Sequence, residues 1–91
     1  MNFKIIKILP FVFMIKLDHY TEENLNHLRL WLRDHYLISV RGLEVHLDLP
    51  ISTVKHFVSG RRLLSFYNYK LVVLHLYSYG YNLPHSNALL Q

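Results

Sequence analysis

SVRGLEVHLDLPISTVKHFVSGRR, residues 39–62, contains the strongest structural signals of this chain. Ser39 is an N-cap candidate for a helix over 40–47, because its hydroxyl can accept a backbone N–H of the first turn. Asp48–Pro50 form the expected turn, because Pro50 cannot continue this helix but suits the start of another. A second helix over 51–59 then stops at a glycine, a natural left-handed cap. Two short helices joined by a tight turn are the outline of a helix-turn-helix.

The second helix of this motif has distinct inward and outward sides. Val54, Phe57 and Val58 form its apolar stripe and predict which side packs inward. The residues that can receive this stripe, from the first helix and the turn, are Leu43, Leu47 and Leu49. The remaining positions are polar or charged, as required of a helix that enters a DNA groove.

These outward residues are the candidate site. The residues in the first turn and a half of a recognition helix meet base edges, and hydroxyl and ammonium groups can pair with them. The predicted base contacts are Ser52, Thr53, Lys55 and His56, with Thr53 also able to contact phosphate. The predicted phosphate contacts, at the end of the helix or on neighbouring segments, are Arg41, Ser59, Arg61, Arg62 and Lys70.

Helices are also predicted on both sides of the motif. Thr21 caps an expected helix over 22–36, because carboxylates follow it in the first turn. The apolar stripe of this helix is Leu25, Leu28, Trp31 or Leu32, and Tyr36. Ser65 or Asn68 can cap a last helix that runs to about Tyr79. The alternation of apolar and polar residues over 74–81 would also suit a strand, but a helix is favoured because it closes the core.

Together these elements predict an all-α fold, a compact helix-turn-helix bundle of four to five helices with a short N-terminal strand or extended arm. The expected division is an extended segment over 1–17, one domain over 18–82 and a tail over 83–91. The first residues weakly resemble a signal peptide, but their uncharged run over 8–15 is far shorter than the roughly 20 residues that span a bilayer. Met14 can also be the true start of the chain.

Charge is distributed unevenly along the chain. The 91 residues carry ten basic and six acidic side chains, a formal net charge of +4. Up to Asp48 the basic and acidic residues balance, whereas from Leu49 onward there are four cations and no acid. The excess therefore begins at the outward-facing helix of the motif, which favours a surface that meets phosphates.

Other classes of function have little support in the sequence. Cysteine is absent, which suits a cytoplasmic protein and removes disulfides and thiolate metal sites. No two of the seven histidines are four residues apart, and His27 and His35, eight apart, lie on different sides of a helix. Neither a glycine-rich phosphate loop nor a nucleophile beside a base is present. We therefore expect no enzyme activity, cofactor, metal, small-molecule substrate or membrane association.

The motif resembles the helix-turn-helix regulators of the lambda-repressor-like (Xre-type) family, over about 39–82. Leu-Pro-Ile-Ser-Thr-Val-Lys at 49–55 is similar to the turn and the start of the recognition helix in that family. Phe-Val-Ser-Gly-Arg-Arg at 57–62 resembles the end of that helix, and Leu-Tyr-Ser-Tyr-Gly-Tyr at 76–81 the end of the next. The resemblance implies a small transcriptional regulator, of phage or mobile-element type, that binds specific double-stranded DNA sequences with the recognition helix in the major groove, as a homodimer.

Two residues depart from the family pattern. Glu44 stands where the family usually has a small residue between the two helices, which implies a wider helix crossing or a register shifted by a residue or two. Asp48 stands where glycine is usual, a milder change because aspartate tolerates the left-handed conformation.

An alternative function is a small protein–protein interaction module that does not bind DNA. The C-terminal third is rich in tyrosine, a residue type enriched at protein interfaces. The tyrosines in question are Tyr67, Tyr69, Tyr77, Tyr79 and Tyr81. They can equally fill the core of a domain that has a single alanine.

Overall fold

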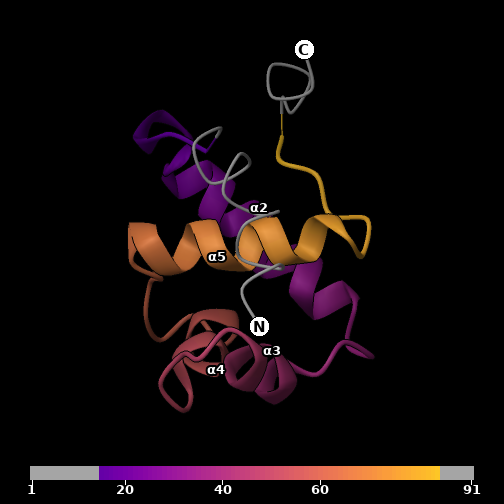
Figure 1. The fold of residues 1–91 in the computed structure, drawn as a ribbon. Helices are drawn as coiled ribbons and strands as arrows, with labels where there is room; N and C mark the ends of the chain where they lie inside the picture. Colours follow the sequence, from indigo (N-terminus) through magenta and orange to yellow (C-terminus); the bar gives the residue numbers. More distant parts are fainter. Residues whose placement is uncertain (1–14, 85–91) are drawn as a thin grey trace, which may run out of the picture.

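A computed structural model of the chain describes residues 15–84, and this part of the molecule is all-helical, as predicted (Figure 1). A short 3-10 helix, η1, precedes four α-helices. Their bounds are Leu17–His19 (η1), Glu22–Asp34 (α2), Val40–His46 (α3), Thr53–Val58 (α4) and Phe66–Tyr77 (α5). α5 runs through the middle of the molecule and α2 crosses it, while α3 and α4 pack together on one side of α5. Residues 1–14 of the expected N-terminal arm and 85–91 of the expected tail lie outside the described residues.

Three of the helices begin at the residues that the sequence indicated. The hydroxyls of Thr21, Ser39 and Ser65 each accept a hydrogen bond from the backbone N–H three residues later, at 3.1, 2.9 and 3.1 Å. Each of these bonds satisfies an N–H that has no partner within its own helix. The caps predicted at Thr21 and Ser39 are confirmed, and Ser65, rather than Asn68, caps α5.

Some helix ends differ from the sequence prediction. α2 ends at Asp34, two residues early, so Tyr36 lies beyond the buried stripe and is 80% exposed. α4 begins at Thr53 rather than 51, because Ser52 has a φ of 70°, a left-handed conformation that cannot continue an α-helix. The segment 74–81, which also suited a strand, forms the end of α5 and the turn after it.

The core is built from the inward side of every α-helix. Val54 and Phe57 of α4 are fully buried and Val58 packs against the core, which confirms the predicted inward stripe. The other helices and their connections contribute Leu25, Leu28, Leu32, Leu43, Leu49, Leu64, Tyr69, Val72, Val73, Leu74, Leu76 and Tyr81. Ile15 and Leu83, at the two ends of the described region, are buried as well. The packed part of the chain therefore extends beyond the expected domain bounds of 18 and 82.

Aromatic side chains fill the space between α2 and α5. Trp31, predicted to be a core residue, is half-buried at the core edge, where its ring stacks on His35 at 3.7 Å and meets Tyr81 edge-on at 5.2 Å between centroids. The hydroxyl of Tyr81 lies 3.0 Å from Nδ1 of His27. Burial raises the pKa of both Tyr69 and Tyr81 above the ordinary tyrosine value.

Candidate nucleic-acid interface

The turn between α3 and α4 has the backbone geometry that a tight helix–turn–helix requires. Asp48 has a φ of 59°, so aspartate occupies the left-handed position that it was expected to tolerate. The N–H of Leu49 donates to the Glu44 carbonyl at 2.8 Å, which ties the turn back to α3. α4 therefore leaves the turn packed against α3, with its inward stripe in the core.

Glu44 caps the beginning of α4. Its side chain is 1% exposed, and its two carboxylate oxygens accept three backbone N–H groups. Oε1 accepts from Ser52 at 3.0 Å, and Oε2 accepts from Val54 at 2.8 Å and from Lys55 at 3.0 Å. Ser52 itself, in its left-handed conformation, makes no side-chain cap. A residue of α3 therefore supplies the N-terminal cap that α4 lacks.

Arg41 shares the charge of this buried carboxylate. Its Nη1 donates to Oε1 of Glu44 at 3.2 Å, and its own side chain is 57% exposed. Burial alone would raise the pKa of Glu44, but the N–H groups of Lys55 and Ser52, the Arg41 guanidinium and the N–H of Val54 together outweigh it. The pKa of Glu44 therefore lies below its ordinary value, and the carboxylate is ionised at neutral pH.

Glu44 is accommodated without a shift in the register of α3. A wider helix crossing or a shifted register was expected because a large acidic residue replaces a small one. The register is the expected one, since Ser39 caps α3 and Leu43 is buried. The extra volume of Glu44 is used to reach the N–H groups of α4.

Two arginines from α2 hold the other end of α4. Nε of Arg29 donates to the Phe57 carbonyl at 2.9 Å, and its guanidinium lies over the Phe57 ring, 5.1 Å from the centroid. Nε of Arg33 donates to the Val58 carbonyl at 2.9 Å. Neither arginine was given a role from the sequence. Their i,i+4 spacing, which puts them on one side of the helix, was the available signal.

The two ends of α4 are therefore held by opposite charges that match the helix dipole. A carboxylate lies at the N-terminal end, where the dipole is positive, and guanidinium groups lie at the C-terminal end. With six residues, α4 is too short to be stable alone. Its position depends on these contacts and on the burial of its inward stripe.

The predicted base contacts lie around the outward side of α4 and the turn before it. Lys55 is exposed, and Ser52, Thr53 and His56 are half-buried. The Thr53 hydroxyl donates to the Pro50 carbonyl at 2.7 Å, which leaves its oxygen available only as an acceptor. Ser52 lies at the junction between turn and helix, rather than one residue inside the helix as predicted.

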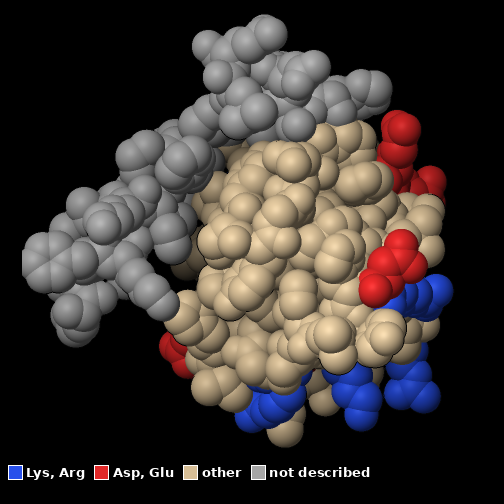
Figure 2. Space-filling view, turned by 90° about the vertical axis from the view of Figure 1, so that its right-hand side faces the viewer, with Lys and Arg blue, Asp and Glu red and all other residues tan. Residues whose placement is uncertain are grey.

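Most of the predicted phosphate contacts surround the same helix. Ser59 is exposed, although its hydroxyl donates to the His56 carbonyl at 3.0 Å. Arg61 and Arg62 are exposed and follow directly after Gly60, whose φ of 86° turns the chain at the end of α4. Figure 2 shows lysine and arginine side chains gathered along the lower edge of the molecule, at the level of α3 and α4 in Figure 1.

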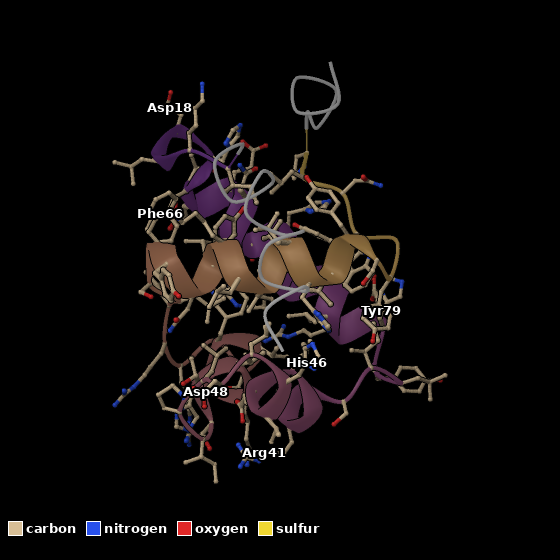
Figure 3. The ribbon with its side chains drawn as sticks, in the orientation of Figure 1. Asp18, Arg41, His46, Asp48, Phe66 and Tyr79 are labelled. Atoms are coloured by element: carbon tan, nitrogen blue, oxygen red, sulfur yellow. The ribbon has the colours of Figure 1, made fainter. Side chains whose placement is uncertain are left out.

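Lys70 does not join this group. Its Nζ lies 4.6 Å from the centroid of the Phe66 ring, and that ring packs edge-on against Tyr20, beside η1. Figure 3 shows Phe66 on the side of α5 that faces away from Asp48 and Arg41. The structure therefore brings eight of the nine predicted site residues around α3 and α4 and places Lys70 elsewhere.

The tyrosines of the C-terminal third do not form one surface. Tyr69 and Tyr81 are fully buried and Tyr77 is half-buried, so most of this group belongs to the core. Tyr67 and Tyr79 are exposed, at 64% and 55%, but lie near opposite ends of α5. Twelve residues separate them, which corresponds to roughly 18 Å along a helix.

Comparison with protein-family models, with curated proteins and with solved structures gave no match for this chain. Within residues 15–84, the helices are all too short or too polar to cross a bilayer. In the same range, no group of three or more His, Cys, Asp or Glu side chains is arranged so that it could hold a metal ion.

Proposed function

We propose that this protein binds specific sequences of double-stranded DNA as a small transcriptional regulator, with α4 in the major groove. The observation that supports this most strongly is the way α4 is held. Both of its ends and its apolar side are tied to the rest of the domain, while its outward side stays polar and is flanked by cations. A short helix supported on its main chain and open on one side is suited to present side chains to a groove.

The structure suggests how the site residues divide their roles. Lys55 is the most accessible base-contacting candidate on α4 and can donate to guanine O6 and N7. His56, Ser52 and Thr53 lie beside it, and Thr53 would act as a hydrogen-bond acceptor for an amino group of a base. Each of these contacts would discriminate between base pairs.

Phosphate contacts would come from the residues around α4. Ser59 is the C-cap residue of α4, and Arg61 and Arg62 follow it. Arg41 lies beside the N-terminal end of α4, and its exposed guanidinium, which donates to Glu44 through Nη1, would donate to an approaching phosphate through its other N–H groups. Lys70 is left out of the proposed interface because of its position beside Phe66. These contacts would supply affinity without sequence preference.

Sequence enrichment from a random duplex pool, followed by fluorescence anisotropy on the enriched site, tests the proposal. We expect binding that weakens steeply between 50 and 200 mM salt, since phosphate contacts release counterions. Absence of binding to any duplex at low salt would refute the proposed function. Size-exclusion chromatography with light scattering, with and without the enriched duplex, would show whether two copies bind together, as expected for a homodimer.

Two variants separate base contacts from phosphate contacts. Lys55→Ala should change which sequence is enriched, with a cost of about 1–3 kcal/mol on the original site. The double change Arg61→Ala, Arg62→Ala should instead weaken binding to all duplexes alike and lower the salt dependence. An unchanged enriched sequence for Lys55→Ala would remove Lys55 from the base-contacting set.

A further inference from the structure

Arg33 of α2 has more hydrogen-bonding capacity than its known contact uses. A guanidinium has five N–H donors, and among the described residues 15–84 the partner found for Arg33 is the Val58 carbonyl, to which its Nε–H donates at 2.9 Å. The side chain is exposed, and within residues 15–84 no hydrogen bond or ion pair of its two terminal nitrogens is found. The bond to Val58 fixes one edge of the group and leaves the other nitrogens at the surface beside the end of α4.

Arg29, one turn earlier, is used differently. Its Nε donates to the Phe57 carbonyl, its Nη1 donates to Oδ1 of Asn26 at 3.0 Å, and its guanidinium lies over the Phe57 ring. It is half-buried and supports α4 from within. The two arginines hold neighbouring carbonyls of the same helix end, but Arg33 is the one whose free donors reach solvent.

We propose that Arg33 is a phosphate-binding residue of the DNA interface, oriented for this contact by its hydrogen bond to Val58. This inference rests on the proposed function. Arg61 and Arg62, which are proposed to contact phosphate, follow the same end of α4, so the guanidinium of Arg33 lies at the end of the helix where the other phosphate contacts are expected. A guanidinium held at that end can present two parallel N–H donors to one phosphate.

This contact would give the Arg33 side chain two functions, the support of α4 and the binding of DNA. The same side chain binds the main chain of α4 and the DNA backbone, so the phosphate contact fixes the orientation of α4 in the groove. Arg33 also adds α2 to an interface whose other cations, apart from Arg41, come from the second half of the chain. Up to Asp48 the charges balance, and sequence counting alone cannot show which of those cations lie beside α4.

The test is the salt dependence of DNA binding for Arg33→Ala, Arg33→Lys and, as a matched control, Lys70→Ala. Arg33→Ala should reduce the magnitude of the slope of log affinity against log salt by about 1, the value that corresponds to one phosphate contact. The affinity ratio of wild type to Arg33→Ala should then be about 3.5 times larger at 50 mM than at 200 mM salt. Arg33→Lys keeps the charge and should restore most of the slope. Lys70→Ala removes one cation on the other side of α5 and should leave the slope unchanged.

Several outcomes separate this inference from the proposed function. If the wild type binds DNA with a steep salt dependence and Arg33→Ala shows the same slope, Arg33 makes no phosphate contact and the inference is wrong, while the proposed function stands. If the wild type does not bind DNA, both fail. Loss of the Val58 bond would lower stability alone and would not change the slope of the folded protein. Arg33→Gln, which is also neutral, replaces the alanine variant if that variant does not fold.

Discussion

Replacing Glu44 by alanine tests the capping of α4 from α3. The change removes the acceptor of three backbone N–H groups, of which that of Val54 is fully buried and those of Ser52 and Lys55 are partly buried. A buried N–H without a partner costs about 1–3 kcal/mol, and the two others cost less because water can reach them. Arg41 is exposed and remains solvated when its partner is lost. We therefore expect a loss of about 3 kcal/mol.

That loss is large for a domain of this size. Small domains are stable by about 5–10 kcal/mol, so Glu44→Ala should remove about 30–60% of the free energy of unfolding. Urea denaturation at pH 7, followed by Trp31 fluorescence and far-ultraviolet circular dichroism, measures it. With an m-value of about 1.5 kcal/mol/M, the midpoint should fall by about 2 M.

Glu23→Ala is the matched control for this experiment. Glu23 also lies at a helix N-terminus, in the first turn of α2, but it is exposed, and Thr21 caps that helix. Its removal should cost less than about 1 kcal/mol, the range of a surface charge near a helix dipole. Equal costs for the two variants would show that Glu44 does not cap α4.

Two further predictions concern pH. The pKa of Glu44 is lowered on folding, so its ionised carboxylate makes the wild type more stable than Glu44→Gln. This difference in stability should be fully present above about pH 4.5 and should decline as the pH falls through the lower pKa of the folded state. Urea midpoints of both proteins from pH 7 to pH 3 measure the difference, and a difference that stays constant would contradict the prediction. Tyr69 and Tyr81 have raised pKa values when folded, so the stability they contribute should be complete below about pH 10 and decline above it. In a spectrophotometric titration these two tyrosines should ionise only as the protein unfolds, and six or more of the seven tyrosines titrating together near pH 10 in a folded protein would argue against their burial.

Local features of the fold could be predicted from the sequence because short-range chemistry determines them. The caps at Thr21 and Ser39 depend on a hydroxyl three residues before the N–H that it accepts. The inward stripe of α4 follows from helical spacing, and the left-handed Asp48 from the few residue types that tolerate that conformation. In each case the partners lie within one or two turns of each other in the chain.

The contacts that hold α4 could not be predicted in the same way. Glu44 reaches N–H groups eight to eleven residues away, and Arg29 and Arg33 reach carbonyls 28 and 25 residues away. Such contacts depend on how the helices cross, which propensity and periodicity do not specify. The sequence did carry an indication, since an acidic residue at a position that usually packs between helices needs a partner in the core. Only the fold shows that this partner is the N-terminal end of α4.

The contacts that hold the ends of α4 have a consequence for how its specificity can change. Glu44, Arg29 and Arg33 bind the main chain of α4, and every residue type except proline offers the same N–H and carbonyl groups. Substitutions at the outward positions Lys55 and His56 therefore leave the support of the helix intact. Under the proposed function, such a domain would acquire a different target sequence by changes at its surface alone, without compensating changes in its core, and it would be a suitable scaffold for a library randomised at those positions.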